Sequence, residues 1–380
     1  MPLELRTLIG PDGSLQLSQA EVPQPRPAAA DEVVVRVEAA PINPSDLALL
    51  LGGADLGQAQ AARVQDRPAV VAPVPPERLA GLAARIGQPL SAGNEGAGTV
   101  VAAGSAPEAQ ALLGRRVAVL ALPGQGIYAQ YRAVAASQCL ALPPGASAAQ
   151  GAAAFVNPLT ALGMVETARR EGHTALALTA AASSLGQMLL RLCQGDGLEL
   201  VCIVRRPEQA ALLRAQGARH VVDSSAPDFA ARLVDTFAAT GTRLAFDATG
   251  GGAMPGQLIQ AMEAALLRQP GRGYDRYGSQ IHKQVYIYGY LERGPTALPP
   301  GLGMAWGVNG WLVFSFWRAL PPERRAALQA RIAAELTTTF ATRYEREWTL
   351  DELLTPEALR ACAQMATGRK CLLRLAPDGS

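Results

Sequence analysis

A short turn of small residues carries the first chemical signal in the sequence. It runs Leu178-Thr-Ala-Ala-Ala-Ser-Ser-Leu-Gly186 and leads from a buried apolar run into an amphipathic one. In the dinucleotide-binding fingerprint, three glycines allow the tight turn, the approach of the diphosphate and close packing of helix on strand. Ala181 and Ser183 occupy the first two of these positions, and Gly186 occupies the third. Backbone N–H groups at a helix N-terminus bind anions. The expected diphosphate contacts are Ala182, Ser183, Ser184, Leu185 and Gly186.

Two arginines follow the next apolar run. A domain that prefers NAD carries Asp or Glu at this point, where the acidic side chain binds the ribose hydroxyls. Arg205 and Arg206 are suited instead to the 2′-phosphate of NADPH, because guanidinium–phosphate bonds are charge-assisted. The alternative is a solvated basic pair that opens a surface helix. The position of the pair favours the phosphate role.

A glycine-rich turn, Asp247–Gly252, follows a third apolar run. In open α/β sheets, ligands bind at the carboxyl ends of the strands, where such a turn would lie. A plain tight turn is the alternative, and the clustering with the two preceding features argues against it. The further candidates for cofactor contact are Thr249, Gly250, Gly289, Tyr290 and Lys370.

Alternating strand-like and helix-like runs must position these residues. From about Asn157 onward the runs alternate at the spacing of a doubly wound parallel sheet, a Rossmann fold. The predicted strands are Ala175–Thr179, Leu198–Val204, His220–Val222, Leu244–Asp247 and Gln284–Gly289. The predicted helices are Leu159–Arg170, Leu185–Cys193, Pro207–Gln216, 228–239 and Gln257–Leu267.

The first part of the chain has a different pattern, with short Val-rich runs separated by Gly and Pro. Alternation of apolar and polar residues predicts strands and a small β-barrel. The predicted strands are 31–40, Thr99–Ala103, Arg116–Ala121 and Tyr128–Ala135. An Ala-, Pro- and Gln-rich segment, Gly52–Leu90, is long for a barrel loop and contains a helix-like stretch near Pro76–Arg85. A final strand, Lys370–Leu375, follows a helix near Thr355–Met365 and is expected to join this barrel. The fold class is therefore α/β.

Composition excludes several classes of protein. The 380 residues are 49% hydrophobic and 17% charged, which is enough apolar material for a large core. A net charge of +2 does not favour nucleic acid or an anionic membrane as partner. Five cysteines without a Cys-x-x-Cys pair do not predict a disulfide framework or a zinc cluster. The N-terminus has no signal-peptide pattern and no apolar run approaches the roughly 20 residues that span a bilayer, so we expect a cytoplasmic protein.

Several motifs in the order found here resemble a known family. They are Pro41–Asp46, Gly93–Gly98, Phe155–Ala161, Ala180–Gly186 and Gly217–Val222. Together they resemble the zinc-independent medium-chain dehydrogenase/reductases, in the quinone-oxidoreductase and enoyl-thioester-reductase branch. The resemblance implies a GroES-like β-barrel catalytic domain, residues 1–156 and 340–380, and a Rossmann NADP-binding domain, residues 157–339. It also implies an active site in the cleft between them and a homodimer formed by edge-to-edge pairing of Rossmann domains.

The resemblance also bears on metal chemistry. Asn43 and Asn94 stand where zinc alcohol dehydrogenases carry Cys and His ligands, and amides are poor zinc ligands. The three histidines, at 173, 220 and 282, lie outside the loops that hold metal in this family. No metal site is therefore expected. The implied reaction is hydride transfer from NADPH to a quinone, enone or other activated alkene, which needs little activation by a metal.

Hydrogen-bond donors would stabilise the oxyanion that forms in such a reaction. Asn43 and Thr160 are the candidate catalytic residues, although Asn43 could merely cap a turn and Thr160 could merely open a helix. Tyrosine is absent from both places where this branch carries one: the Gly52–Leu90 segment has no tyrosine, and Ala48 occupies the other position. The remaining candidates for a proton-donating tyrosine are Tyr128, Tyr274, Tyr277, Tyr288 and Tyr290.

The substrate-side candidates are Asn94, Trp306 and Asn309. The aromatic run from Trp306 to Trp317 fits a subunit interface or a core better than a substrate pocket, and Trp306 and Asn309 are the candidates for the pocket side. Glu95 is expected to be structural. Two other functions remain open: reduction of an unsaturated acyl thioester, and binding of NADPH without turnover.

Overall fold

The computed structural model describes residues 1–122, 124–269, 271, 274–364, 367 and 370–375. The chain divides into two compact units, one of Met1–Val156 with Gln329–Ser380 and the other of Asn157–Leu328. The second boundary precedes the 339/340 junction expected from the sequence.

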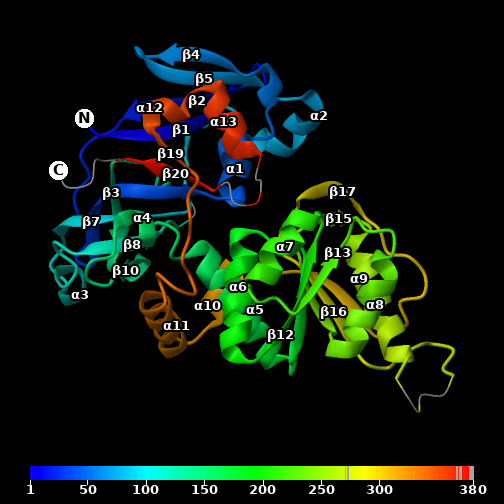
Figure 1. The fold of residues 1–380 in the computed structure, drawn as a ribbon. Helices are drawn as coiled ribbons and strands as arrows, with labels where there is room; N and C mark the ends of the chain where they lie inside the picture. The colour runs from blue at the N-terminus through cyan, green and yellow to red at the C-terminus, as the bar shows by residue number, and fades with distance from the viewer. Residues whose placement is uncertain (123, 270, 272–273, 365–366, 368–369, 376–380) are drawn as a thin grey trace. The chain divides into compact units, whose positions relative to one another are not determined.

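Two sheets form the first unit (Figure 1). One sheet has the order β4-β5-β2-β1-β6, with bounds Gln60–Val64, Arg67–Pro73, Ser14–Glu21, Leu3–Ile9 and Leu90–Ser91. The other has the order β10-β8-β7-β3-β20-β19, with bounds Cys139–Ala141, Arg116–Leu120, Glu95–Ala103, Glu32–Ile42, Cys371–Arg374 and Arg346–Thr349. Strand β9, Tyr131–Ala135, also pairs with β3. Their alternating apolar residues, among them Leu5, Val35 and Leu373, form one buried core.

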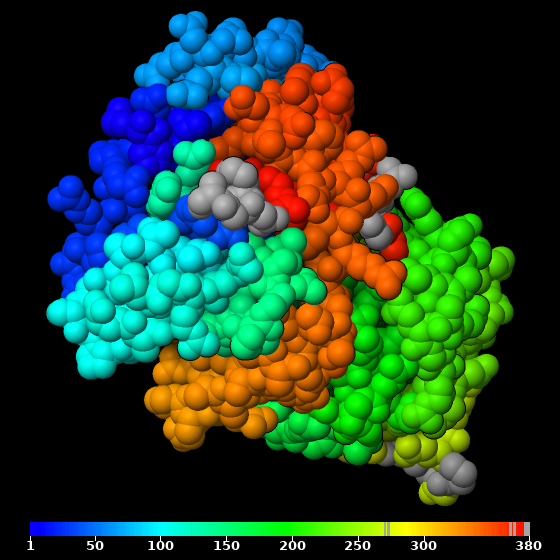
Figure 2. Space-filling model, turned by 60° about the vertical axis from the view of Figure 1, so that its left-hand side comes forward, coloured from blue at the N-terminus to red at the C-terminus, as the bar shows by residue number. Residues whose placement is uncertain are grey.

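The last strand belongs to this first unit, as predicted. Strand β20 runs antiparallel to β3, with Cys371 opposite Ile42 and Leu373 opposite Ala40. In the space-filling view, red residues of the C-terminal part lie beside the orange-red segment that precedes them in the chain (Figure 2), and from there β20 pairs with β3 of the N-terminal part. This long-range pairing brings residues near position 370 beside residues near position 43.

The Gly52–Leu90 segment contains a hairpin that the sequence analysis missed. Strands β4 and β5 are joined by Gln65 and Asp66, which have φ values of +49° and +60°. Two residues with positive φ are the geometry of a type I′ hairpin turn. Strand β4, Gln-Ala-Ala-Arg-Val, has no buried residue and does not alternate apolar with polar residues, which is the pattern by which strands are recognised. The helix-like stretch corresponds to α2, Pro76–Leu79, followed by a 3₁₀ helix, Ala80–Arg85.

Short helices complete the first unit. They are α1 Pro44–Leu51, α3 Pro107–Gln110, α4 Ala148–Gly151, α12 Leu350–Leu353 and α13 Pro356–Ala363, with 3₁₀ turns Leu56–Gln58 and Ala136–Gln138. Helix α1 begins at Pro44, whose fixed φ suits the first helical position, and ends at Gly52 in the left-handed conformation. In the first sheet of this unit, strands β1 and β2 were, like β4 and β5, not predicted from the sequence.

The second unit is the predicted doubly wound sheet. Its order is β13-β12-β11-β14-β16-β18, and every pair is parallel. The bounds in chain order are β11 Ala175–Leu178, β12 Glu199–Val204, β13 His220–Asp223, β14 Leu244–Asp247, β16 Lys283–Ile287 and β18 Trp306–Gly310. Numbered along the chain, this order is the 3-2-1-4-5-6 of the dinucleotide-binding fold. The structure therefore confirms the α/β prediction and adds a sixth strand, β18, which two glycines and an asparagine conceal in the sequence.

Helices cover both faces of this sheet (Figure 1). They are α5 Val156–Arg170, α6 Ser184–Asp196, α7 Pro207–Ala215, α8 Phe229–Thr240 and α9 Met254–Leu267; α10 Val313–Ala319 and α11 Pro322–Ala334 follow β18 in the chain. Helices α8 and α9 pack side chains such as Leu233, Phe237 and Met262 against Val201 and Val285 of the sheet. A small ribbon of β15, Gly250–Gly252, and β17, Glu292–Thr296, lies beside it.

Candidate functional site

The turn after β11 has the shape that a diphosphate requires. Ser183 caps α6, because its Oγ accepts a hydrogen bond from Gly186 N at 3.1 Å. A Cβ added at Gly186 would lie 2.1 Å from Ala181 O, so only glycine allows this helix so close to the turn. The N–H groups of Ser184 and Leu185 in the first turn have no intrahelical partner. Because the Ala182 and Leu185 side chains are buried, their contacts to a diphosphate would come from the backbone.

Asp247 fixes the neighbouring loop at the same edge of the sheet. Its fully buried carboxylate accepts from Thr179 Oγ1 at 2.7 Å, from Thr249 Oγ1 at 2.7 Å and from Gly250 N at 2.7 Å. Ala248 N donates in turn to Thr179 Oγ1 at 2.7 Å. These bonds tie the carboxyl ends of β11 and β14 into one rigid edge. The turn was predictable from the sequence, whereas the role of the Asp247 side chain in organising it was not.

The other cofactor candidates of this unit flank that edge. Arg205 and Arg206 are exposed immediately after β12, and neither forms an ion pair with any residue that the structure describes. Gly250 has φ +73°, and a Cβ there would lie 2.5 Å from Gly289 O and 2.6 Å from the ring of Tyr290. Gly289 and Tyr290 therefore contact Gly250 directly, and the Tyr290 side chain is 73% exposed.

Three other predicted residues lie elsewhere in this unit. Thr160 is buried in the second turn of α5. Trp306 begins β18 opposite Lys283, at the amino end of the sheet, and its Nε1 donates to Gly303 O at 3.1 Å while its ring packs on the α8–α9 core. Asn309 accepts from Gln284 Nε2 at 3.0 Å. The structure does not bring Trp306 to the edge that carries the Ser183 turn.

The predicted residues of the first unit gather around Glu95. This glutamate is fully buried; its Oε1 accepts from Asn43 Nδ2 at 2.9 Å, and its Oε2 accepts from the backbone N–H groups of Phe155 and Val156, each at 2.9 Å. The Asn43 side chain therefore does not cap α1, although the residue occupies the cap position. Its Oδ1 is buried without a hydrogen-bond partner in the described part of the chain.

Asp46 joins the two amide-bearing loops. Its Oδ2 accepts from Asn43 N and its Oδ1 from Asn94 N, both at 2.8 Å. Asn94 Nδ2 donates to Ser45 Oγ at 3.0 Å. Burial, and to a lesser extent the neighbouring Glu95 carboxylate, raise the pKa of Asp46 to about 6, although its hydrogen bonds from the Asn43 and Asn94 backbone oppose this change. Asp46 is thus a structural link with an unusually basic carboxylate.

Tyr128 is the candidate tyrosine that belongs to the first unit, and its hydroxyl already donates a hydrogen bond. Tyr128 Oη donates to Pro41 O at 2.9 Å. Its ring lies against Gly93, where an added Cβ would be 2.5 Å from the ring carbons. Gly93 also has φ +99°, which explains the glycine at this position. Tyr128 therefore packs the turn and is a poor candidate for a proton donor.

Lys370 and Tyr344 complete the cluster. Strand pairing positions both: Cys371 lies opposite Ile42, and Glu345 N donates to Lys370 O at 3.0 Å. Lys370 Nζ and Tyr344 Oη are buried, and neither has a hydrogen-bond partner among the residues described. Burial lowers the pKa of the Lys370 ammonium, while the Glu95 and Asp46 carboxylates oppose that change. Burial and the nearby Glu95 raise the pKa of the Tyr344 phenol well above its usual value, which keeps it protonated.

Three unpartnered polar atoms thus belong to residues that interact with Glu95, Asn43 by a hydrogen bond and Lys370 and Tyr344 electrostatically: Asn43 Oδ1, Lys370 Nζ and Tyr344 Oη. A buried polar atom without a partner costs about 1–3 kcal/mol, so such a cluster indicates a place for a ligand. Sequence reasoning named Asn43 and Lys370 but missed Tyr344, which no motif marks. Only the pairing of β19 with β20 would have revealed it.

Two negative findings apply to the residues that the structure describes. No group of three His, Cys, Asp or Glu side chains has the geometry to hold a metal ion there. In the same residues, every helix is too short or too polar to cross a membrane.

Comparison with known proteins agrees with this architecture. Residues 29–144 match the alcohol dehydrogenase GroES-like domain. A quinone oxidoreductase of Pseudomonas aeruginosa is 30% identical over 165 residues, which are 43% of this chain and 50% of that protein. This chain thus aligns with only half the length of that curated relative.

Solved structures extend the likeness to the whole chain. A Mesorhizobium loti protein described as an NADPH:quinone reductase is 28% identical, with a TM-score of 0.72 and 98% of each chain covered. Escherichia coli quinone oxidoreductase, solved with NADPH, shares the fold at 18% identity, with a TM-score of 0.68 and coverage of 98% of this chain and 99% of that one. Residues 29–144 thus belong to the alcohol dehydrogenase GroES-like domain family, and the chain as a whole is similar in sequence and fold to proteins described as quinone oxidoreductases.

Proposed function

We propose that this protein is an NADPH-dependent oxidoreductase that transfers a hydride to a quinone or another conjugated carbonyl or activated alkene, without zinc. The observation that carries the proposal is the set of three unpartnered buried atoms around Glu95. An acceptor oxygen placed there would meet an ammonium and a phenol. Both groups stabilise negative charge as it develops on oxygen.

The second unit offers the features that NADPH needs. The diphosphate of NADPH fits the N-terminus of α6. Gly186 allows the helix to pack close to the turn there, and Ser184 and Leu185 supply N–H groups that have no partner within the helix. The 2′-phosphate fits the exposed guanidinium groups of Arg205 and Arg206. When bound, the cofactor supplies the hydride. The relatives named for NADPH:quinone reduction support this choice of cofactor.

The first unit would supply the proton. Reduction of a conjugated carbonyl adds a hydride at carbon and leaves negative charge on oxygen. Lys370 Nζ is the best donor to that oxygen, because burial lowers its pKa and so eases proton release. Tyr344 Oη would donate a hydrogen bond to the same oxygen, while Asn43 Oδ1 would accept from a donor on the substrate or from a bound water. Asn43 and Asn94 donate their amide N–H groups to neighbouring side chains, which supports a hydrogen-bonding role over metal ligation.

The test is an NADPH-oxidation assay with a benzoquinone, an enone, an enoyl thioester and a saturated aldehyde, with metal content measured on the same sample. We expect turnover with the quinone or the enone and little with the aldehyde, in metal-free protein. Turnover confined to the thioester would assign the enoyl-thioester reductase function instead. Tight NADPH binding with no turnover on any acceptor would identify a silent NADPH-binding protein.

We also infer a homodimer formed through β18. This strand pairs only with β16 among the described strands, so its outer edge is open. Light scattering on the purified protein should give twice the mass of the chain, and a monomer mass at micromolar concentration would refute the inference.

A further inference from the structure

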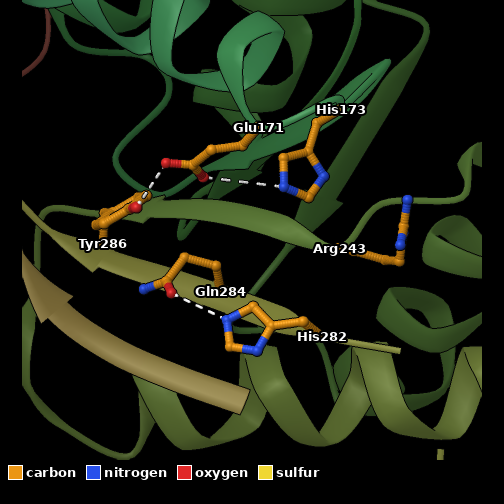
Figure 3. Close-up of a pocket in the computed structure, with 6 residues that line it drawn as sticks. All are labelled: Glu171, His173, Arg243, His282, Gln284 and Tyr286. Atoms are coloured by element: carbon orange, nitrogen blue, oxygen red, sulfur yellow. Dashed lines mark hydrogen bonds and ion pairs between the residues drawn. The ribbon is translucent and has the colours of Figure 1, made fainter. Parts of the chain in front are cut away.

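A polar cavity lies within the Rossmann unit, away from the edge of the sheet proposed to bind the cofactor. It has a volume of about 290 Å³ and is lined by Glu171, His173, Arg243, His282, Gln284 and Tyr286 (Figure 3). It contains two of the three histidines in the chain. None of the residues discussed for hydride transfer lines it.

Topology explains why these side chains meet. His173, Arg243 and His282 each lie one or two residues before a strand, namely β11, β14 and β16. These strands are adjacent and parallel, so the three residues converge at the amino edge of the sheet. The Ser183 turn lies at the opposite, carboxyl edge. Glu171 follows the end of α5 and Tyr286 projects from β16 (Figure 3).

The two ends of the cavity differ in charge and in hydrogen bonding. At one end, Tyr286 Oη donates to Glu171 Oε1 at 2.7 Å, and Arg170 Nη2 lies 3.6 Å from the same oxygen. At the other end, the Arg243 guanidinium pairs with no carboxylate among the described residues. His173 Nε2 lies between them, 4.0 Å from Glu171 Oε2. The cavity therefore has one acidic acceptor and one open cation.

The groups facing His173 make an anion favourable there. Burial, Arg243 and His282 lower the pKa of His173, and Glu171 opposes them. His282 is linked to Gln284 Oε1 at 3.2 Å, and the Gln284 amide donates to Asn309. A bound anion between Arg243 and His173 would favour the protonated form of His173, which burial and the neighbouring Arg243 otherwise disfavour.

We propose that this cavity binds a small carboxylic acid that also carries a hydroxyl or ammonium group. The planar carboxylate would pair with the fork of Arg243 and with His173, and the donor group would bind Glu171. A volume of about 290 Å³ is about twice that of a cavity that holds benzene, so the ligand would be small. Phosphate suits the site less well, because a dianion would face the Glu171 carboxylate.

Calorimetric titration of the full-length protein with glycolate, glycine, acetate and phosphate at constant ionic strength tests the proposal. We expect glycolate or glycine to bind at least ~5-fold more tightly than acetate, because only they offer a donor to Glu171. Binding should tighten as the pH falls from about 8 to about 6, because the bound anion favours protonated His173. Absence of binding by all four probes, or a preference for phosphate, would overturn the proposal.

Two variants and a control locate the binding. Arg243→Gln should weaken glycolate binding at least ~10-fold, and Glu171→Gln should reduce the preference for glycolate over acetate. Arg219→Gln removes another arginine that precedes a strand at the same edge, but Arg219 is paired with Glu199 and lies outside the cavity. It should leave binding unchanged. Equal binding by the Arg243 variant and the wild type would place the ligand elsewhere and refute the site, whether or not the protein reduces quinones.

Discussion

The cofactor edge of the Rossmann unit and the Glu95 cluster of the barrel unit are built from different parts of the chain. The edge consists mainly of backbone, with a capped helix N-terminus and small side chains. It includes Gly186, where an added Cβ would lie 2.1 Å from the carbonyl oxygen of Ala181. The cluster is mainly side chain: an ammonium, a phenol and an amide around one buried carboxylate. A backbone site is broken by added volume, whereas a side-chain site is broken by deleting one functional group.

The largest effect is expected from added volume at the cofactor edge. Gly186→Ala places a methyl group against Ala181 O, so the helix must move away from the diphosphate. We expect NADPH affinity to fall on the order of 1000-fold, measured by fluorescence titration. Gly195→Ala, in the same helix, is the matched control, because its Cβ would meet no atom within 4 Å. That variant should bind NADPH normally, and equal losses in both would mean that the turn does not hold the diphosphate.

Deletion of one group should break the side-chain cluster. Lys370→Met removes the buried ammonium beside Glu95, and we expect kcat/KM for a quinone to fall about 100-fold. NADPH affinity should stay within about 2-fold of the wild type. The sequence alone suggested Lys370 as a cofactor contact. A large loss of NADPH affinity with unchanged kcat would restore that interpretation and remove Lys370 from the proton pathway.

The arginine pair is the one part of the cofactor edge that depends on side chains. Replacing Arg205 and Arg206 by Ala should weaken NADPH roughly 30-fold and leave NADH within about 2-fold, because only NADPH carries the 2′-phosphate. Arg214→Ala, in the following helix, controls for net charge. The loss of NADPH affinity should shrink in high salt. Equal losses for both cofactors would exclude a role in phosphate selection.

The two tyrosines near Glu95 provide a matched pair within the cluster. Tyr344→Phe deletes a hydroxyl without a partner, so it should lower kcat by about 3- to 10-fold with no loss of stability. Tyr128→Phe deletes a hydroxyl that donates to Pro41 O, and it should lower the free energy of unfolding by about 1 kcal/mol instead. Urea unfolding and steady-state kinetics on both variants decide the matter. A stability loss in Tyr344→Phe equal to that in Tyr128→Phe would make Tyr344 a packing residue.

Sequence periodicity predicted most of the Rossmann unit, because its buried strands are continuous apolar runs between helices. It failed at β18, which contains two glycines, and at the exposed hairpin of β4 and β5. Those strands exist because neighbouring strands offer backbone hydrogen bonds, which the local composition does not record.

The candidate site divides in the same way. The close packing at Gly186 was predictable because it depends on short-range spacing within the β11–α6 turn. The role of the Arg205–Arg206 pair, which follows β12, stays a prediction from the sequence. The approach of Lys370 and Tyr344 to Asn43 was not predictable, since it depends on the register that places Cys371 opposite Ile42. Positions separated by more than 300 residues carry no shared local pattern.

The smallest expected effect concerns the carboxylate that links the two amide-bearing loops. The pKa of Asp46 is about 6 in the folded protein and near 3.8 when the chain is unfolded, because burial disfavours its charge. Between these values the folded state binds a proton that the unfolded state has released, so raising the pH through this window lowers stability. Asp46→Asn lacks this titration but loses one acceptor for the N–H groups of Asn43 and Asn94. The variant should be less stable than the wild type at every pH, and the gap in unfolding free energy should be roughly 1 kcal/mol wider at about pH 5 than at about pH 7. If the difference in unfolding free energy between the wild type and Asp46→Asn instead widens toward neutral pH, the fold stabilises Asp46 as the carboxylate. The proton that the folded cluster retains would then be on Glu95.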